Sequence, residues 1–158
     1  MVEQKERLDR FSADARVWLY AANRRLVQDD IHAIENKLKA FTAQWAAHGK
    51  PLMADFQILK SSVVILVVEE SVAAPSGCSI DASVHLMKSI GNELNIDFFD
   101  RMNVWLSKDD DLKRVHVSAL AAYHQEGWAV LDCTADKLKN VTQNWPKALN
   151  DSAYKNFL

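Results

Sequence analysis

The sequence predicts an α+β fold with a mostly antiparallel sheet and helices mainly on one face. Three observations predict it: apolar residues recur at helical spacing in two long segments, short β-rich segments lie between them, and turn residues separate the segments. In chain order these segments give strand, helix, strand, strand, helix, strand over about ninety residues, which is a ferredoxin-like βαββαβ pattern. We expect residues 15–107 to form this core, with four or five strands in the sheet.

A single domain accounts for the chain, because 158 residues is close to the usual size of one hydrophobic core. Apolar residues make up 49% and charged residues 25%, a balance typical of a globular protein and not of a disordered chain. The formal net charge of −2 argues against nucleic-acid binding, which needs a basic face. Cys78 and Cys133 lie far apart without C-x-x-C spacing, so a disulfide scaffold and the common zinc and redox motifs are excluded.

Two features of the sequence bear on location. Residues 1–14 are a charged lead-in without the apolar centre of a signal peptide. The longest apolar run, residues 63–68, is much shorter than the roughly 20 residues that a membrane-spanning helix needs. We therefore expect a cytoplasmic protein with free thiols and no membrane partner.

The first strand and the first helix have clear signals. Residues 16–22 are rich in β-forming residues and predict a strand. An apolar stripe with steps of three and four residues runs from Ile31 to Trp45 and predicts a helix. Gly49, suited to a left-handed position after a helix, and Pro51 end that helix.

Two strands and a second helix follow. Residues 53–60 and 62–69 predict strands joined by a polar turn, and the second is apolar on both sides, as in a strand covered on both faces. The hydroxyl of Ser79 is expected to cap a helix that extends to about Leu94. A strand at residues 102–106 completes the core.

Residues 108–158 are expected to form a C-terminal extension. The acidic residues at the start of residues 109–125 suit the positive end of a helix dipole, so this segment is predicted to be a helix. Residues 128–133 predict a further strand. Thr134 then caps a last helix, which ends before Pro146 because proline cannot continue a helix.

The winding of the predicted core brings two distant segments to one end of the sheet. In a ferredoxin-like core the first helix ends, the third strand ends and the second helix begins at the same edge. Residues 45–49 and 76–81 are therefore expected to meet there. The catalytic candidates are Cys78, His48 and Asp81, and the binding candidates are Trp45, Glu69, Glu70, Ser79, Arg24 and Arg101.

Cys78 is the strongest candidate for chemistry. A thiol beside a helix N-terminus lies near unpaired N–H groups, which favour the reactive thiolate. His48 would be its base, and Asp81 or Glu70 would orient the imidazole. A structural interpretation stays open, because cysteine is often buried, a histidine before glycine can cap a helix, and a carboxylate suits a first turn.

A zinc-supported site is a third interpretation. Asp81 and His85 lie four residues apart on one helical face and can share a metal ion, with Cys78 or His48 as further ligands. Such pairs are frequent by chance, so we predict no metal and no cofactor.

The arginines at the opposite edge allow two roles. Arg24, Arg25 and Arg101 can hold a phosphate or carboxylate through paired hydrogen bonds. Pairing of these arginines with Asp97 and Asp100 is the alternative, and the sequence favours it.

Several short motifs resemble a family of short bacterial proteins, some of which carry the label "ABC transporter ATPase". The motifs are Trp18-Leu19-Tyr20 followed by Arg24, Phe41-x-x-x-Trp45-x-x-His48-Gly49, Glu69-Glu70, Ser76-Gly77-Cys78-Ser79-Ile80-Asp81 and Phe99-Asp100-Arg101. The resemblance covers residues 16–106 and implies no established activity. The label has no support here, because the chain lacks the phosphate-binding motif G-x-x-x-x-G-K-[ST].

The sequence therefore favours a non-catalytic binding or interaction protein, which self-associates through an open sheet face or edge and has a small site near the start of the second helix. The first alternative is a cysteine-dependent hydrolase or transferase with Cys78 as nucleophile and His48 as base. The second is a zinc-supported site at His48, Cys78, Asp81 and His85.

Overall fold

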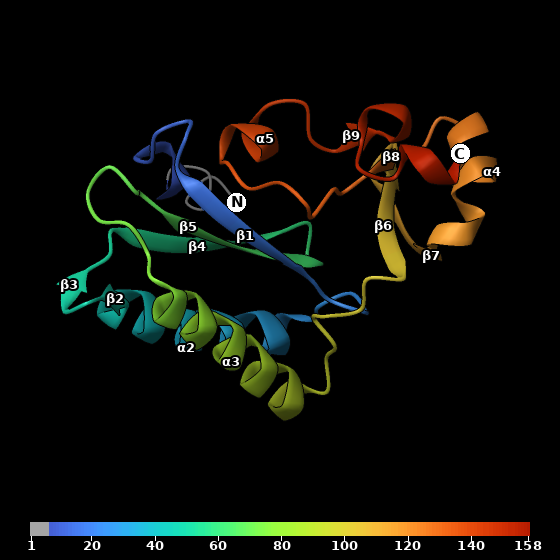
Figure 1. The fold of residues 1–158 in the computed structure, drawn as a ribbon. Coiled ribbons are helices and arrows are strands. Elements are labelled where there is room, and N and C mark those ends of the chain that lie inside the picture. Colours follow the sequence, from blue (N-terminus) through green and yellow to red (C-terminus); the bar gives the residue numbers. More distant parts are fainter. Residues whose placement is uncertain (1–6) are drawn as a thin grey trace.

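The computed structural model describes residues 7–158 and confirms an α+β fold with mostly antiparallel sheets (Figure 1). Part of the expected lead-in at residues 1–14 lies outside the described residues. Helices α2 (Gln28–Gln44) and α3 (Gly77–Leu94) cover one face of a three-stranded sheet, and a second, four-stranded sheet lies beside it (Figure 1). Within residues 7–158, no helix combines the length and the apolar character that crossing a membrane requires.

The first sheet contains β1 (Arg16–Ala21), β4 (Ala54–Leu59) and β5 (Val63–Val68), in the order β1-β5-β4. All neighbours are antiparallel, and Val68 lies opposite both Arg16 and Ala54. Every residue of β5 is buried, which confirms the prediction from its uninterrupted apolar run.

Helices α2 (Gln28–Gln44) and α3 (Gly77–Leu94) confirm the two long amphipathic segments. Their inward faces and the sheet form the largest core, in which Ile34, Leu38, Met87 and Ile90 are fully buried. The predicted cap of α3 was one turn too late, because Ser76 accepts the hydrogen bond from the backbone N–H of Ser79 at 3.1 Å.

The predicted end of the first helix was wrong. The helix ends at Gln44, and β2 (Ala46–Ala47) then pairs with β3 (Lys50–Pro51) in a small hairpin. His48 and Gly49 form its two-residue turn with φ of 51° and 80°. Turns of this kind need positive φ at both positions, so the glycine that can end a helix also suits a tight hairpin.

The second sheet contains β6 (Asn103–Lys108), β7 (Asp111–His116), β8 (Ala129–Val130) and β9 (Lys147–Ala148), in the order β7-β6-β8-β9. The strand expected at residues 102–106 exists as β6, but it pairs with β7 and β8 and not with the first sheet. The four-stranded sheet of a ferredoxin-like core is therefore not confirmed.

The C-terminal helices differ most from expectation. Asp109 and Asp110 have φ of 49° and 69° and form the two-residue turn between β6 and β7, so the helix predicted over residues 109–125 was wrong. Only α4 (Leu120–Gln125) and α5 (Lys139–Thr142) are α-helical in this region. Short 3₁₀ helices lie at η1 (Val117–Ala119), η2 (Leu149–Asp151) and η3 (Lys155–Phe157).

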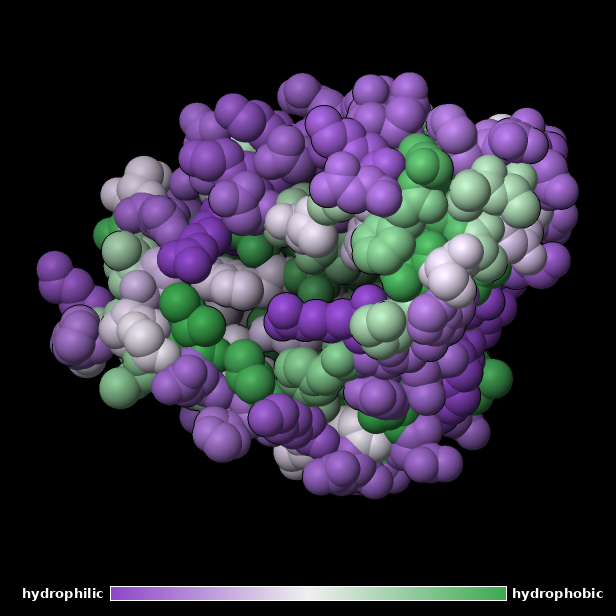
Figure 2. Space-filling model, turned by 45° about the vertical axis from the view of Figure 1, so that its right-hand side comes forward, coloured by the Kyte–Doolittle hydropathy of each residue, from purple (hydrophilic) through white to green (hydrophobic). Residues whose placement is uncertain are grey.

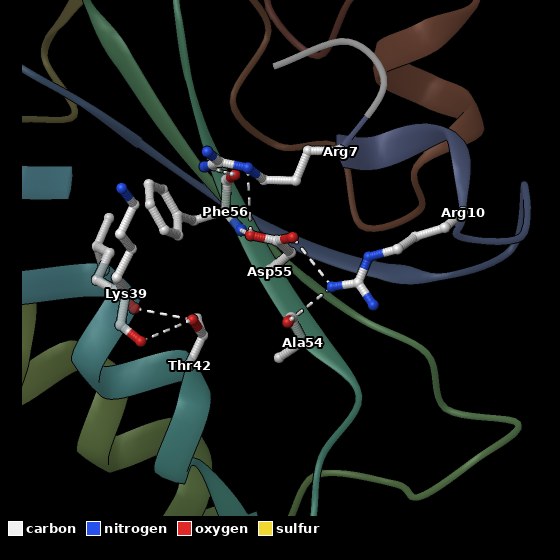
Figure 3. Close-up of polar contacts among 8 residues, drawn as sticks. Arg7, Arg10, Lys39, Thr42, Ala54, Asp55 and Phe56 are labelled. Atoms are coloured by element: carbon white, nitrogen blue, oxygen red, sulfur yellow. Dashed lines mark hydrogen bonds and ion pairs between the residues drawn. The ribbon is translucent and has the colours of Figure 1, made fainter. Parts of the chain in front are cut away.

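The outer edge of β4 is covered by arginine side chains. Arg10 and Arg7 donate hydrogen bonds to the carbonyls of Ala54 and Phe56 at 3.4 and 3.3 Å (Figure 3). Both guanidinium groups also pair with the Asp55 carboxylate, at 3.0 and 3.8 Å. Charged side chains on an edge strand block pairing with another chain.

Candidate functional site

Cys78 and His48 line one open pocket of about 430 Å³ at an end of the first sheet. Cys78 is exposed in the first turn of α3, and His48 is exposed in the turn between β2 and β3. Trp45, Ser76 and Ser79 line the same pocket. The structure thus brings together the two segments that chain routing predicted, and it excludes a buried position for Cys78.

Trp45 holds the two sides of this pocket together. Its indole Nε1 donates a buried hydrogen bond of 2.8 Å to the carbonyl of Ser79. Its ring also packs against Phe41 and Trp18, with centroid distances of 4.9 and 5.8 Å. This residue fixes the end of α2 against the start of α3, and only 4% of its surface is exposed.

The contacts that a cysteine nucleophile needs are incomplete. Among residues 7–158, no hydrogen bond joins the His48 ring to the Cys78 thiol. Asp81 is exposed, does not line the pocket and makes no side-chain hydrogen bond to either group in that range. The roles predicted for these residues in catalysis stay predictions.

The zinc alternative finds no cluster of ligands. Within the described part of the chain, no three or more His, Cys, Asp or Glu side chains lie close enough to hold a metal ion. His85 and Asp81 are both exposed on α3, and neither lines the pocket. Their four-residue spacing alone does not build a site.

Glu69 and Glu70 differ sharply, although they are neighbours. Glu69 is buried and accepts hydrogen bonds from the backbone N–H and the hydroxyl of Ser12 at 2.7 and 2.8 Å, and from the Ser71 hydroxyl at 3.2 Å. The bond from the Ser12 backbone is the main cause that lowers the pKa of Glu69. Glu70 pairs with Arg16 at 3.5 Å on the surface. Neither lines the pocket at Cys78, so the binding role predicted for them there is not supported by the geometry.

Arg24 has a structural position. Its guanidinium donates to the Asp30 carboxylate at 2.6 and 3.2 Å and to the carbonyl of Leu94 at 2.9 Å. The hydrogen bond from Arg24 lowers the pKa of Asp30. Arg24 thereby ties the start of α2 to the end of α3, and its expected pairing with Asp97 and Asp100 was wrong.

The other charged residues of that edge are also rearranged. Asp100 pairs with Arg114 at 3.4 Å and accepts from the side chain of Asn103, the main cause that lowers the pKa of Asp100. Asp97 accepts from the backbone N–H of Phe99. Arg101 is exposed and makes no ion pair within residues 7–158.

A larger cavity of the protein was not predicted from the sequence. A groove of about 650 Å³ lies where the two sheets meet, and Figure 2 shows this face hollowed at its centre with apolar residues in the hollow. The groove is lined by β1, the segment around Arg101, Leu131, residues 133–136 and Tyr154. No local motif signals this groove, because it depends on β6 joining the second sheet.

Two groups that line the groove opposite β1, the Cys133 thiol and the Tyr154 phenol, stay protonated at neutral pH. Burial raises the pKa of the Cys133 thiol to about 12, and the nearby Asp132 adds to the shift. Burial likewise raises the pKa of Tyr154 to about 12. This wall therefore offers neither a thiolate nor a phenolate at neutral pH.

Comparison of the chain with protein-family models, with curated proteins and with solved structures found no match. The resemblance to short bacterial proteins therefore stays a prediction from the motifs.

Proposed function

We propose that the protein is a non-catalytic binding protein with a small-ligand pocket at the start of α3. The observation that carries the proposal is the open pocket at Cys78, where no base within residues 7–158 hydrogen-bonds to the thiol. Its volume of about 430 Å³ is within the range of ligand pockets, roughly 300–1,000 Å³. Phe41 and Ala82 offer apolar surface, and His48 offers a hydrogen-bonding group to the same ligand.

We further propose a cytoplasmic protein of the bacterial family that its motifs resemble. On this proposal, β1, β4, β5 and the two long helices represent most of a ferredoxin-like core, whose last strand has moved into the second sheet. The order of β1, β5 and β4 and their antiparallel directions support this interpretation.

A cysteine-dependent enzyme is the second candidate function. The exposure of Cys78 in the first turn of α3 favours it, because a substrate can reach the thiol there. His48 on the same pocket favours it as well, since catalytic hydrogen bonds are often long before substrate binds.

Alkylation with iodoacetamide separates the two functions. We expect one thiol, Cys78, to react in the folded protein and Cys133 to react only after unfolding, because its pKa of about 12 keeps it protonated. If the protein only binds a ligand, His48→Asn should change the alkylation rate of Cys78 by less than about twofold. If His48 is a catalytic base, the same substitution should lower the alkylation rate by about 100-fold or more.

The matched control is His85→Asn, since His85 is exposed on the same helix as Cys78 but does not line the pocket. Mass spectrometry after each time point assigns the modified cysteine. A Cys78 that reacts far faster than glutathione, and loses that rate in His48→Asn alone, would overturn the binding proposal and establish the enzyme. Stoichiometric zinc in protein purified without chelator would instead support the zinc alternative.

A further inference from the structure

Strand β1 has a free outer edge that faces the large groove. Among residues 7–158, β5 is the one strand that pairs with β1 in the first sheet, so β1 is an edge strand. Backbone groups alternate in direction along a strand. The N–H of Ala22 donates to Ser62 on the β5 side, whereas the N–H of Val17 donates outward to the carbonyl of Asp136. Leu19 and Ala21 therefore direct their backbone groups outward, into the groove.

The two ends of this free edge are already occupied. Near its start, the residues around Lys137 pair antiparallel with Arg16, through hydrogen bonds of 3.0 Å from Val17 to Asp136 and 2.8 Å from Leu138 to Ala15. At its end, the indole Nε1 of Trp105 donates to the carbonyl of Ala22 at 2.8 Å.

Between these ends the edge is open. Among the residues that the structure describes, none hydrogen-bonds to the outward N–H or carbonyl of Leu19 or to the outward N–H of Ala21. The open stretch is about four residues long, or roughly 13 Å at the usual rise of a strand. It has the hydrogen-bonding pattern that an added strand requires.

The other edge of the same sheet is treated differently. On β4, the outward carbonyls of Ala54 and Phe56 accept hydrogen bonds from Arg10 and Arg7, as Figure 3 shows. Those side chains prevent an added strand there. Of the two outer edges of this sheet, the one that stays open is therefore the edge of β1, which faces the groove.

The side walls of the groove suit apolar side chains on both faces of an added strand. Tyr20, Phe99 and Val84 line the wall on the helix side, and the rings of Tyr20 and Phe99 meet edge to face at 5.7 Å. Leu19 and Leu131 line the opposite wall. A strand covered on both faces is typically rich in valine and similar residues.

Charge adds one preference. Arg101 lines the groove without an ion pair within residues 7–158, whereas Arg16 pairs with Glu70 and Asp100 pairs with Arg114. Asp136 is exposed near the occupied start of the edge, where its backbone already bonds to Val17. A carboxylate on the occupant would therefore pair with Arg101.

We propose that an extended, mostly apolar peptide segment of another protein, bearing a carboxylate, adds to β1 between Val17 and Ala21 as an antiparallel strand. The antiparallel direction follows the pairing that Lys137 already makes with Arg16. This mode of recognition takes its affinity from backbone hydrogen bonds and its specificity from alternate side chains. The proposal goes beyond the pocket at Cys78 and does not depend on it.

The test follows individual amide protons by NMR while a blocked hexapeptide of alternating valine and threonine, ending in glutamate, is added to the full chain. In the free protein we expect the amides of Leu19 and Ala21 to exchange faster with solvent than those of Trp18 and Tyr20, which face β5. With the peptide at about 1 mM, a concentration that half-fills a site with a Kd near that value, exchange at Leu19 and Ala21 should slow at least twofold. Trp18 and Tyr20 should not change.

Two comparisons make the result specific. A peptide with alternate backbone nitrogens methylated keeps its side chains but loses donors, and it should bind at least about tenfold more weakly, as expected for two lost hydrogen bonds. Arg101→Ala should weaken the glutamate peptide about threefold or more, whereas Arg25→Ala, at another exposed arginine outside the groove, should not.

Three results would overturn the proposal. The first is no change at Leu19 and Ala21 with the peptide at about 1 mM. The second is equal binding of the methylated peptide. The third is protection of both amides that rises with protein concentration without peptide, because the occupant would then be a second copy of this chain.

Discussion

Single polar residues determine where distant parts of the chain are tied together. Glu69 ends β5, yet its carboxylate is buried under the N-terminal segment, where Ser12 donates two hydrogen bonds to it. Glu70 is exposed and makes one ion pair with Arg16 at 3.5 Å. The sequence placed both glutamates together as binding candidates, because adjacency in sequence does not reveal which of two side chains is buried.

Glu69→Gln tests this difference. Hydrogen bonds to a charged group contribute about 1.5–3 kcal/mol, so we expect the variant to lose about 2 kcal/mol of unfolding free energy at pH 7. The pKa of Glu69 is lowered in the folded protein, so its contribution is complete above the unfolded value of 4.5 and is lost as the pH falls through the folded value. Urea denaturation should therefore show a smaller difference between the variant and the natural sequence at acidic pH.

The control for Glu69→Gln is Glu70→Gln, which removes only a surface ion pair. We expect a change of about 0.5 kcal/mol or less. Equal losses in both variants, or a difference at Glu69 that persists unchanged at low pH, would contradict the assignment of Glu69 as the buried, ionised tie to Ser12.

Elements with a strong repeating pattern were predicted correctly from the sequence. The apolar stripes of α2 and α3 and the apolar run of β5 identify each element by its own residues. The errors lie at turns: the acidic residues at Asp109 and Asp110 were assigned to a helix start but form a hairpin turn with positive φ. Aspartate suits both environments, so the choice depends on whether the next residues pair as a strand.

The end of α3 gives a prediction at the scale of an element. Gly91 lies on its buried face, and a Cβ there would contact the backbone carbonyl of Ile96 too closely to fit. Asn95 ends the helix in a left-handed conformation, and the chain then folds back over Gly91. We expect Gly91→Ala to destabilise the protein by about 1–3 kcal/mol, although alanine favours helices.

Gly77→Ala is the matched control at the other end of α3. In the described part of the chain, no atom beyond the adjacent residues and the helix backbone lies within 4 Å of a Cβ built there, so the variant should change the unfolding free energy by less than about 1 kcal/mol. Chemical denaturation of both variants measures the difference. A Gly91→Ala protein as stable as Gly77→Ala would show that the backbone around Ile96 moves away readily.

The whole molecule explains which of the two cavities was predictable. The pocket at Cys78 and His48 depends on the three strands of the first sheet, β1, β4 and β5, and on the two long helices. The sequence predicts all of these elements. The groove depends on which sheet β6 joins. The sequence of β6 predicts a strand but not which of the two sheets it joins. Its partners are set by pairing with residues 111–116 and 129–130, which local periodicity does not reveal.

Trp105 on β6 connects the two sheets. Only 5% of its surface is exposed, it packs with Val63 of β5 and Leu131, and its indole donates to the buried carbonyl of Ala22 at 2.8 Å. Because this contact joins the sheets, we expect them to unfold together, with coincident transitions by circular dichroism and tryptophan fluorescence. Trp105→Phe should lower both midpoints and cost about 2 kcal/mol or more, since it leaves the Ala22 carbonyl without a donor and a cavity beside it.

The comparison for Trp105→Phe is Trp128→Phe, at a half-buried tryptophan that packs edge to face on Tyr123 within the second sheet's own cluster. The loss there should stay near about 1 kcal/mol, because no contact between the sheets is removed. If the natural sequence instead shows two separate transitions, or if Trp105→Phe shifts only one of them, the two sheets are independent units. The groove between them would then lack the fixed second wall that holds the edge of β1 open.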